Sequence, residues 1–535
     1  MPESTGGAAL VRALENHGVN TVFGIPGTHN LEVYAALADS PIRAVLPRHE
    51  QGAGYAADGY ARVSGRPGVC LTTTGPAILN AAAAAAQAWS DSVPVLFISP
   101  GMPLGHPGRG TGLLHEVKDQ HAALDAVVAY SHRVTAVGEI PQAVAQAFAA
   151  MRTGRPRPVH LEIPLDLLDA VGEAPEISPI EPASTRAPSE AVAAAATRLR
   201  AAQRPVLVAG GGSRVASDLL RDLAEVLAAP VVTSANGKGT LDEQHPLSVG
   251  AGLHQPSIRA VLEDADVVVA VGTELAPSDL WDGPIDVDDK LIRIDIDGAA
   301  MLTNANPVER LMGDAPAVLG QLLDALGDLD ASDEGARHAE TARRALRDDV
   351  TAEGALWRPL IDALAPLVDE RTIIAGDSTM ACYYGLLSGL RVRRPAGFLY
   401  PTGGGTLGYG LPAAIGASLT EPGLRIIAVL GDGGMMFTLP ELATAATLRL
   451  PLPVIVVDNG GYGEIAHEMA DRGDPVHSVR LGGVDFPAAA RALGCHGRTL
   501  LSPAELTAAI AEALTADRPT LLHVRAGGDA PQSHE

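Results

Sequence analysis

One carboxylate, Asp432, lies among three glycines directly after the apolar run 425–430. If that run is a buried strand of a doubly wound sheet, Asp432 follows its carboxyl end, where such sheets bind ligands. Gly431, Gly433 and Gly434 would let backbone N–H groups approach a phosphate closely. A single carboxylate among such amides indicates a divalent cation, because Mg²⁺ prefers a few protein oxygens plus substrate phosphates. Taken alone, the same residues also fit an ordinary tight turn.

A second oxygen donor follows the next apolar run, 453–458, in the phrase Asp-Asn-Gly-Gly. Asn459 can offer its amide oxygen to the same cation. The glycines after it leave the carbonyl of Gly461 free to turn inward, and Tyr462 comes next. The intervening chain is long enough for one helix and the next parallel strand, so both phrases are expected at one sheet edge. The predicted metal ligands are Asp432, Asn459 and Gly461.

The composition is that of a globular protein with several cores, and it excludes some partners. With 535 residues, the chain predicts roughly three or four domains of ~150 residues. The net charge of −24 argues against nucleic acid and anionic membrane surfaces. No apolar run reaches the ~18 residues of a membrane span, and no signal peptide is evident. Cys70, Cys382 and Cys495, widely spaced without a CxxC pair, fit a reducing cytoplasm and no zinc site.

Short apolar strands alternate with alanine-rich helical stretches, which predicts an α/β protein. Continuous β-branched runs between helices are typical of strands buried on both faces of a parallel sheet. A segment rich in Pro, Ser and Glu, 173–190, and a charged segment, 327–349, interrupt this pattern. We therefore expect three doubly wound parallel-sheet domains, over residues 1–175, 190–330 and 350–535. The expected strands include 21–25, 68–73, 94–99, 159–163, 205–210, 266–272, 291–296, 425–430 and 453–458.

Four further phrases complete a pattern with the two described first. They are VFGIPGTHNLEVY (22–34), LPRHEQGAGYAADGYAR (46–62), TTTGPAILNAAAAAAQAWSDSVPVLFISP (72–100) and GGGTLGYGLPAAIGA (403–417). In their order along the chain, all six resemble the thiamine-diphosphate (ThDP) enzymes, whose diphosphate motif is GDG followed some two dozen residues later by NN. The general resemblance is to the acetolactate synthase and 2-oxo acid decarboxylase group. The candidate residues in the four phrases are Pro26, Gly27, Glu50, Gly75, Asn80, Gly405 and Leu407.

The resemblance implies pyrimidine-binding, middle and diphosphate-binding domains, with ThDP and Mg²⁺ as cofactors. A glutamate in the place of Glu50 bonds the pyrimidine ring and promotes loss of the thiazolium proton, which is intramolecular acid–base catalysis. Leu407 should be the apolar wedge beneath the bent cofactor, and Gly405 should offer its carbonyl to the pyrimidine amino group. The first Asn of the family motif is Asp458 here. The cofactor contacts implied at the other end are Gly431, Asp432, Gly433, Gly434, Asn459, Gly461 and Tyr462.

The resemblance also implies partners. The family's site lies between the pyrimidine domain of one subunit and the diphosphate domain of another, so a homodimer is the minimum and a homotetramer is common. Relatives use the middle domain for FAD or another nucleotide, or leave it empty. The glycine triplet 210–212 after an expected strand fits either a nucleotide or a tight strand-to-helix turn.

His115 stands where acetolactate synthases carry a glutamine, in the loop phrase GTGLLHEVKDQ (110–120). A histidine near the thiazolium is also a feature of pyruvate decarboxylase-like enzymes. The resemblance therefore makes His115 a candidate to donate a proton after decarboxylation or to hold the substrate carboxylate. An ordinary solvated loop histidine is the alternative.

Two carboxylates, Glu464 and Glu468, lie one helical turn apart where relatives begin the helix that lines the substrate pocket. A carboxylate in a pocket for small apolar acids is costly without a partner, and a guanidinium can fork onto it. The keto acid of arginine, 5-guanidino-2-oxopentanoate, is therefore a candidate substrate, since bacterial decarboxylases for it belong to the family. Alternatively, Glu464 faces away or pairs with an arginine such as Arg472.

We therefore predict a ThDP- and Mg²⁺-dependent, non-oxidative decarboxylase of a 2-oxo acid. The alternative is a carboligase of the acetolactate synthase type, which would release an acyloin in place of an aldehyde. An inactive homologue is disfavoured because Glu50, Asp432 and Asn459 occur together. An acyl-CoA lyase would need a basic CoA site, and no C-terminal basic cluster is evident.

Overall fold

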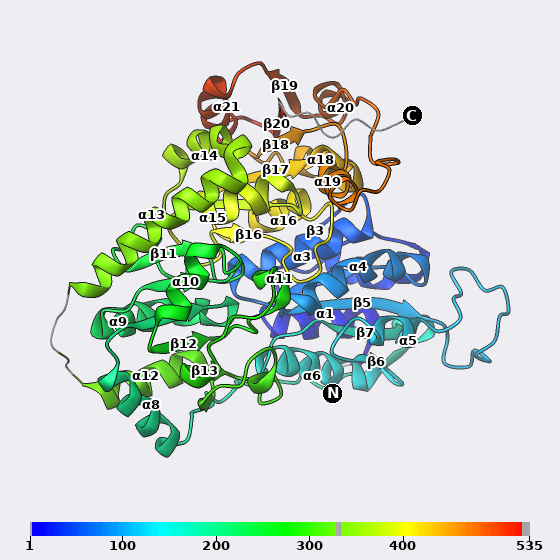
Figure 1. Ribbon diagram of the computed structural model, residues 1–535. Coiled ribbons are helices and arrows are strands. Elements are labelled where there is room, and N and C mark those ends of the chain that lie inside the picture. The colour runs from blue at the N-terminus through cyan, green and yellow to red at the C-terminus, as the bar shows by residue number, and fades with distance from the viewer. Residues whose placement is uncertain (1–2, 328, 330–332, 527–535) are drawn as a thin grey trace.

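Three six-stranded parallel sheets make up the protein (Figure 1). The computed structural model describes residues 3–327, 329 and 333–526. The N-terminal sheet is drawn blue to cyan, the middle sheet green, and the C-terminal sheet yellow to red. Two short strands, β1 (Glu3–Thr5) and β8 (Val171–Glu173), form a separate antiparallel pair. The fold is therefore of the α/β class that the sequence predicts.

Each sheet is built from consecutive strands of one part of the chain. The N-terminal sheet has the order β3-β2-β4-β5-β7-β6, with β2 (Thr21–Gly24), β3 (Arg43–Val45), β4 (Gly68–Leu71), β5 (Val95–Gly101), β6 (Ser131–Arg133) and β7 (Val159–Pro164). The middle sheet has the order β11-β10-β9-β12-β13-β14, with β9 (Pro205–Ala209), β10 (Val231–Thr233), β11 (Ser248–Ala251), β12 (Val267–Val271), β13 (Leu291–Asp295) and β14 (Glu309–Met312). The C-terminal sheet has the order β16-β15-β17-β18-β20-β19, with β15 (Thr372–Gly376), β16 (Phe398–Leu399), β17 (Arg425–Gly431), β18 (Pro453–Asp458), β19 (His496–Leu500) and β20 (Thr520–Arg525).

The strand orders place three candidate ligand edges. The first and third sheets share one topology, although no repeat is visible in the sequence, and the middle sheet has the strand order of a Rossmann fold. In such sheets ligands bind beyond the carboxyl ends of the two strands at which the order reverses. Those strands are β2 and β4, β9 and β12, and β15 and β17.

Helices flank each sheet (Figure 1). The first domain has α1 (Gly6–Asn16), α2 (Leu31–Ala38), α3 (Glu50–Ser64), α4 (Pro76–Ser90), α5 (Gln120–Asp125), α6 (Ile140–Arg152) and α7 (Leu165–Asp169). Next come α8 (Ser189–Ala201), α9 (Ser217–Leu227), α10 (Pro256–Asp264), α11 (Pro277–Leu280), α12 (Ala315–Leu326) and α13 (Glu334–Gly354). The last are α14 (Arg358–Leu364), a π-helix (Ala381–Leu386), α15 (Leu387–Gly389), α16 (Gly410–Ala417), α17 (Asp432–Thr438), α18 (Glu441–Thr447), α19 (Gly463–Asp471), α20 (Phe486–Ala492) and α21 (Leu506–Ala513).

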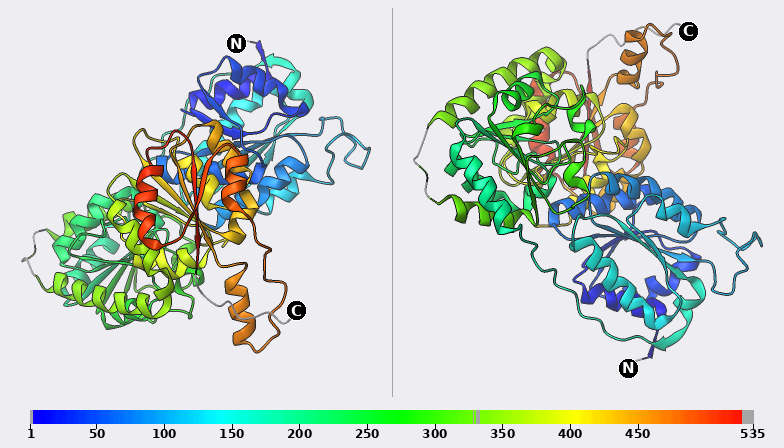
Figure 2. Two further views of the ribbon diagram at one scale, coloured as in Figure 1. Left: turned by 90° about the horizontal axis from the view of Figure 1, so that it is seen from above. Right: turned by 60° about the horizontal axis from the view of Figure 1, so that its bottom comes forward.

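The two interruptions seen in the sequence have different structures. Segment 174–188 contains no helix or strand, and it runs along the outside from the first domain to the middle one (Figure 2). The charged segment 327–349, by contrast, contains much of α13, which packs against α10 and β11 of the middle domain. The expected start of the third domain at residue 350 therefore falls inside a helix. None of the helices described is long and apolar enough to cross a membrane.

Helices α3 and α16 join the first and third sheets into one hydrophobic core. Small residues let their backbones touch. A Cβ on Gly59 would lie 2.3 Å from the carbonyl oxygen of Ala413, and one on Gly416 would lie 1.9 Å from that of Ala56. Larger residues would separate the helices, so the glycine- and alanine-rich pattern sets how closely the two domains pack.

Arg62, in α3, connects all three domains through a buried network. Its guanidinium donates to Asp58 at 2.6 Å and to Asp91 at 2.8 Å in its own domain. It also donates to the amide oxygen of Asn236 in the middle domain at 2.8 Å. Tyr409 of the third domain donates its hydroxyl to Asp58 at 2.7 Å, and its ring lies 5.5 Å from the guanidinium. The two carboxylates and the guanidinium are at most 2% exposed, so removing one partner leaves an uncompensated buried charge.

We expect Arg62→Leu to lower the free energy of unfolding by about 3–5 kcal/mol, because two buried carboxylates lose their counter-charge. Denaturant unfolding followed by circular dichroism measures this loss. The control is Arg66→Leu, just beyond the end of α3, whose residue is exposed; it should change stability by no more than about 0.5 kcal/mol. Equal, small losses in both variants would contradict a stabilising role for the network.

Candidate active site

Asp432 is the first residue of α17, directly after β17. It is 5% exposed, and burial raises its pKa to about 6. The turn leaves no room for side chains on its glycines. A Cβ on Gly433 would lie 2.9 Å from the ring of Tyr462, and one on Gly434 would lie 2.6 Å from a carboxylate oxygen of Asp377. These glycines therefore allow Tyr462 and Asp377 to approach the turn that carries Asp432.

Asn459, after β18, turns its side chain toward Asp432. Its amide oxygen lies 2.7 Å from the carbonyl oxygen of Gly461 and 3.1 Å from a carboxylate oxygen of Asp432. Three oxygens that approach in this way repel one another, unless the amide rotates to present its nitrogen or a cation lies among them. Carboxylate, amide and carbonyl oxygens are all ligands that Mg²⁺ accepts. The donor set therefore fits a divalent cation.

Those ligands do not form a metal site of charged side chains. Within the described ranges, no group of three or more His, Cys, Asp or Glu side chains is placed to hold a metal. A cation at Asp432 would thus depend on an amide, a backbone carbonyl and oxygens from outside the chain, which is the usual situation for Mg²⁺ with a phosphate ligand.

The departure from the family motif, Asp458, is bound on both sides by protein donors. One carboxylate oxygen lies 2.8 Å from Nε2 of His523 on the neighbouring strand β20. The other accepts a hydrogen bond from the backbone N–H of Gly460 at 2.9 Å. The side chain of His523 is 5% exposed, so this histidine gives the carboxylate of Asp458 a buried polar partner.

Glu50 begins α3, and its carboxylate accepts a hydrogen bond from the amide of Asn80 at 3.0 Å. The turn before it is tied to the third domain. A carboxylate oxygen of Glu441 accepts the backbone N–H groups of Arg48 at 2.9 Å and His49 at 3.0 Å. Glu441 is 1% exposed, and burial raises its pKa. Glu441 therefore positions the start of α3 and, with it, Glu50.

Gly75 lets the loop that carries His115 cross the start of α4. Its φ is +64°, and a Cβ there would lie 2.0 Å from the carbonyl oxygen of His115. This crossing brings His115 beside His29, with ring centroids 5.1 Å apart. His29 also lies 3.1 Å from the hydroxyl of Thr74, and burial together with His115 lowers its pKa. The first domain thus presents two facing histidines at the edge where β2 and β4 end.

Two predicted residues precede this pair. Pro26 is exposed, and Gly27 donates its backbone N–H to the side chain of Asn30 at 2.7 Å. A Cβ on Gly27 would come within 3.1 Å of Thr73. The glycine therefore lets the segment after β2 approach the segment after β4.

The segment with Gly405 and Leu407 is held by a carboxylate that the sequence interpretation missed. Asp377, just after β15, accepts the backbone N–H of Gly408 at 2.9 Å and that of Tyr409 at 3.3 Å. Gly405 is exposed with φ +57°, and Leu407 is half-buried. Asp377 thus fixes the segment that should support a bent cofactor.

Glu464, in the first turn of α19, is bound by two tyrosines of the π-helix. Tyr384 donates its hydroxyl to the carboxylate at 2.7 Å and Tyr383 at 3.3 Å. Arg472 pairs with Asp474 rather than with Glu464, so that alternative is wrong. In the described ranges no basic side chain makes an ion pair with Glu464. The second candidate of this helix, Glu468, is exposed.

The predicted residues therefore form two groups. One gathers at the ends of β15, β17 and β18 around Asp432, and the other at the ends of β2, β3 and β4 around Glu50 and His115. Across the described part of the chain, no hydrogen bond or ion pair joins members of the two groups. The residues that sequence reasoning missed are His29, Asp377, Tyr383, Tyr384 and Glu441. Of these, Asp377 had a usable signal, since it follows a strand at an edge where ligands bind.

A cavity of about 790 Å³ lies where the three domains meet, at the carboxyl ends of β9 and β12. Its lining includes Arg62 and Asp91 from the first domain and Gly211, Gly212 and Arg214 from the middle domain. Burial, followed by the charge of Arg62, lowers the pKa of Arg214 to about 10. The glycine triplet of the sequence therefore borders a hollow with a guanidinium.

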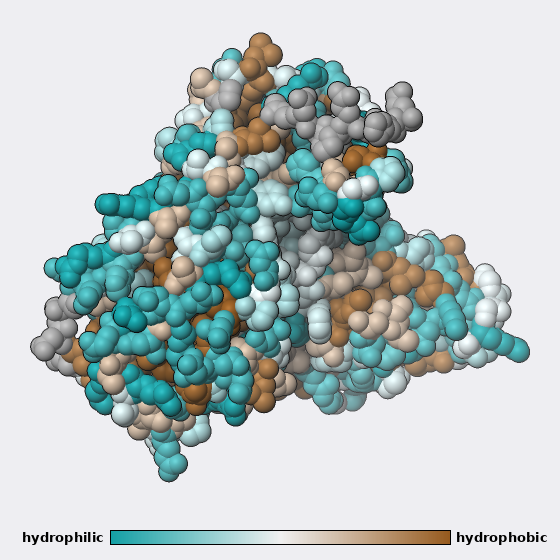
Figure 3. Space-filling view, in the orientation of Figure 1, coloured by the Kyte–Doolittle hydropathy of each residue, from teal (hydrophilic) through white to brown (hydrophobic). Residues whose placement is uncertain are grey.

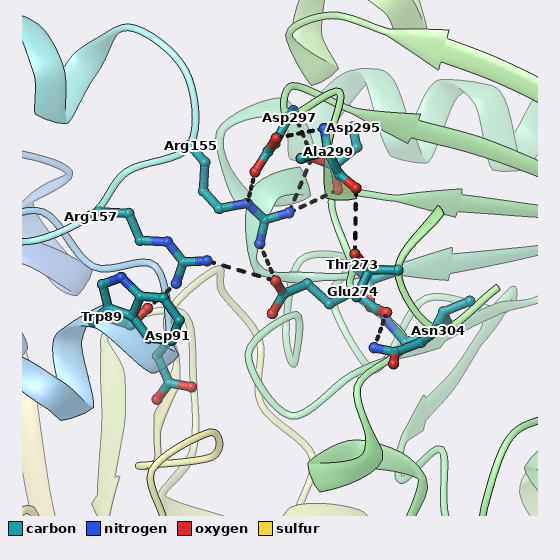
Figure 4. A network of polar contacts seen from close by, with 12 residues as sticks. Trp89, Asp91, Arg155, Arg157, Thr273, Glu274, Asp295, Asp297, Ala299 and Asn304 are labelled. Atoms are coloured by element: carbon teal, nitrogen blue, oxygen red, sulfur yellow. Dashed lines mark hydrogen bonds and ion pairs between the residues drawn. The ribbon is translucent and has the colours of Figure 1, made fainter. Parts of the chain in front are cut away.

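The lining of this cavity includes part of a network of charges (Figure 4). Arg155 of the first domain lies 2.6 Å from Glu274, 3.2 Å from Asp295 and 3.3 Å from Asp297, all in the middle domain. Arg155 is 12% exposed at its side chain. Arg155 thus pairs with the carboxylates of Glu274, Asp295 and Asp297.

Comparisons with known proteins agree with this arrangement. Models of the thiamine pyrophosphate enzymes match residues 4–123 as the N-terminal TPP binding domain, 192–322 as the central domain and 375–524 as the C-terminal TPP binding domain. A probable 2-ketoarginine decarboxylase, AruI, of Pseudomonas aeruginosa is 43% identical over 92% of this chain and 88% of the relative. The acetolactate synthase isozyme 1 large subunit of Escherichia coli is 32% identical over 97% of this chain and 94% of the relative. A probable acetolactate synthase large subunit of Methanocaldococcus jannaschii is also 32% identical, over 97% and 91%. The chain therefore belongs to the thiamine pyrophosphate enzymes, in the group of the acetolactate synthases and 2-oxo acid decarboxylases.

Proposed function

We propose that this enzyme decarboxylates 5-guanidino-2-oxopentanoate, the 2-oxo acid of arginine, with ThDP and Mg²⁺. The main support for this substrate is Glu464, in the first turn of α19, shortly after the predicted metal ligands. Its carboxylate is oriented by Tyr383 and Tyr384. The Pseudomonas relative, a probable 2-ketoarginine decarboxylase, supports the same substrate.

The chain's own residues have distinct parts in this reaction. When bound, ThDP supplies the nucleophilic carbon and the electron sink that allow a 2-oxo acid to lose CO₂. Glu50, whose carboxylate is held by the amide of Asn80, would be the proton-exchanging group at the pyrimidine ring. Leu407 would make an apolar contact with the cofactor. His115, with His29 beside it, would be the proton donor to the product.

We infer that Asp432, Asn459 and Gly461 bind Mg²⁺, because a carboxylate, a side-chain amide and a backbone carbonyl converge there, and a bound cation would select the amide orientation that presents its oxygen. We expect Asp432→Asn to weaken ThDP binding in the presence of Mg²⁺ by at least about tenfold, since the site loses its only charged ligand. Isothermal calorimetry with and without Mg²⁺ measures this.

The matched control is Asp458→Asn, the same change at the adjacent carboxylate. It restores the asparagine of the family motif and leaves an oxygen for His523, so ThDP affinity should stay close to that of the unaltered enzyme. Equal weakening by both substitutions would show that general charge, rather than coordination by Asp432, holds the cofactor.

We expect Glu464 to favour a cationic substrate over pyruvate. A carboxylate held by two tyrosine hydroxyls is ordered before any ligand binds, and it has no basic partner within the described ranges. A guanidinium can donate two parallel hydrogen bonds to such a carboxylate. The small apolar side chain of pyruvate would instead leave the carboxylate facing an apolar group, which costs free energy.

We expect Glu464→Gln to lower kcat/KM for 5-guanidino-2-oxopentanoate by about 10- to 100-fold, the value of a lost charge-assisted hydrogen bond. Turnover of the neutral analogue 5-ureido-2-oxopentanoate should change little. CO₂ release with both acids measures the ratio. Asp471→Asn, an exposed carboxylate at the end of α19, is the control. A preference for pyruvate that Glu464→Gln leaves unaltered would contradict the proposed substrate.

The second candidate reaction is carboligation, which the acetolactate synthase relatives support. The product distinguishes the two reactions, because decarboxylation releases 4-guanidinobutanal and carboligation releases an acyloin. A tail-binding carboxylate at Glu464 favours the first, since the relatives that are named for acetolactate act on an acid without a cationic tail.

We propose that the active site is completed by a second copy of the chain, so that a homodimer is the smallest active unit and a homotetramer the expected assembly. Within one chain, the Glu50 and Asp432 groups share no hydrogen bond or ion pair in the described ranges. Apolar surface gathers over the first domain near α4 and β5 (Figures 1 and 3). Leu46, Leu79 and Leu114 of the first domain are exposed apolar side chains.

Mixing two inactive variants tests this proposal. In a mixed dimer of Glu50→Gln and Asp432→Asn chains, one of the two shared sites has both residues intact. Co-refolded or co-expressed chains should recover about one quarter of the unaltered activity, because half of random dimers carry one intact site of two. No recovery, with mixed dimers demonstrated by mass spectrometry, would indicate a site within a single chain.

The middle domain contains a second candidate ligand site. We propose that the cavity beside Arg214 takes FAD or another nucleotide, since a buried guanidinium beside a glycine turn suits a phosphate. Flavin absorption of the purified protein distinguishes FAD from the colourless nucleotides.

We also propose a cytoplasmic location, which is supported by Cys70, Cys382 and Cys495, because all three are free and buried.

A further inference from the structure

We infer that Trp281 of the middle domain forms the second wall of the tail site and selects a planar cation over a neutral group of the same shape. This inference rests on the proposed decarboxylation of 5-guanidino-2-oxopentanoate and adds a specificity-determining residue from a different domain. It depends on three observations: a strained turn that presents the indole, an aromatic stack that fixes it, and the tyrosines that it shares with Glu464.

The backbone at Trp281 is strained. Its φ and ψ are +49° and −64°, and the N–H of Asp282 donates to the carbonyl of Leu280 at 2.6 Å. Together these describe a γ-turn with positive φ, which is rare and unfavourable for a bulky residue. Such conformations persist where the surroundings over-determine them, often at ligand sites. Trp281 follows α11 directly, and the residue is 40% exposed.

An aromatic stack fixes the indole ring. Trp281 lies parallel to the imidazole of His254, with centroids 3.7 Å apart and planes 16° apart. His254 is 4% exposed, and burial lowers its pKa to about 4. The indole N–H also donates to the carbonyl of Ser278 at 3.0 Å. The stacking partner is therefore neutral at physiological pH, so it does not repel a cation on the indole's other side.

The same indole contacts the two tyrosines that orient Glu464. Its ring meets Tyr384 edge-on at 5.8 Å and Tyr383 at 6.3 Å, and the two tyrosine rings are 4.6 Å apart. Both tyrosines donate to the carboxylate of Glu464. Aromatic faces and a carboxylate thus occur together, and a guanidinium can stack on the first while it donates hydrogen bonds to the second.

The surrounding charge has the sign that a cationic tail needs. The carboxylate of Glu353 accepts a hydrogen bond from Gln255 at 2.5 Å and lies 3.9 Å from Nε2 of His254. Burial, with the charges of Asp349, Asp282 and Glu464 as further causes, raises the pKa of Glu353. The carboxyl groups near the aromatic wall therefore repel one another, and a bound cation would relieve that repulsion.

Removing the π-face should cost affinity for the cation and little for its neutral analogue. We expect Trp281→Leu to lower kcat/KM for 5-guanidino-2-oxopentanoate by about 5- to 30-fold, mostly through KM, as the loss of a desolvated cation–π contact predicts. With 5-ureido-2-oxopentanoate the loss should stay below about twofold. Trp281→Phe keeps an aromatic face and should recover most of the guanidino activity.

A binding measurement without turnover gives an independent readout. The chain has three tryptophans, Trp89, Trp281 and Trp357. Titration with 4-guanidinobutyrate should change the intrinsic fluorescence of the unaltered protein and of the Trp89→Phe control. The change should be lost in Trp281→Phe, which retains the other two indoles.

The outcomes separate this inference from the proposed reaction. If Trp281→Leu lowers kcat/KM equally for the guanidino and ureido acids, or if Trp281→Phe keeps the fluorescence response, only the role of Trp281 is overturned. An unaltered enzyme that decarboxylates other 2-oxo acids but not the guanidino acid would overturn the substrate and the inference with it. Selective loss on the guanidino acid together with loss of the fluorescence response would establish the role.

Discussion

The burial of one guanidinium, that of Arg62, determines how the three domains meet. A desolvated charge must be paired and hydrogen-bonded, and the partners of Arg62 come from α3, the end of α4 and the middle domain, with Tyr409 of the third domain closing the set. None of these partners can move far without leaving a charge in a dry interior. The close approach of α3 and α16 through Gly59 and Gly416 adds a steric requirement at the same place. Hydrophobic packing holds the domains together, and this polar network allows one relative placement.

In that placement, buried carboxylates of the third domain fix the backbone near the predicted site residues of two sheets. Glu441 of the third domain binds the turn that leads into Glu50 of the first, and Asp377 binds the backbone at Gly408. Both carboxylates are buried and accept backbone N–H groups, which are directional and leave little freedom. Glu441 and Asp377 thus hold in place the residues that would contact a cofactor, without belonging to that set themselves. An active site assembled from domain edges needs such supports, because loops by themselves do not hold reacting groups within a fraction of an ångström.

The proposed site for the substrate tail and the proposed metal site share one physical principle. The proposed metal site brings together the carboxylate of Asp432, the amide of Asn459 and the carbonyl of Gly461, and the proposed tail site holds the carboxylate of Glu464 with two tyrosine hydroxyls. A divalent cation suits the first because the oxygens are few and leave room for phosphate. A guanidinium suits the second because planar aromatic faces accompany the carboxylate. In this proposal, the shape of each site and its neighbouring groups determine which kind of positive charge it binds.

The sequence alone determined the α/β class, the buried strands and the residues at their carboxyl ends, because periodicity and glycine spacing are local properties of the chain. Asp432 and Asn459 could be paired in advance since they follow adjacent parallel strands, and Glu50 followed from the family pattern. Only the tertiary structure decided three pairings. His29 lies beside His115, His523 contacts the carboxylate of Asp458, and Tyr383 and Tyr384 donate hydrogen bonds to Glu464. These pairs join segments far apart in the chain, and no local pattern encodes which of them meet. Their meeting depends on sheet order and on how the domains pack, which are properties of the whole chain.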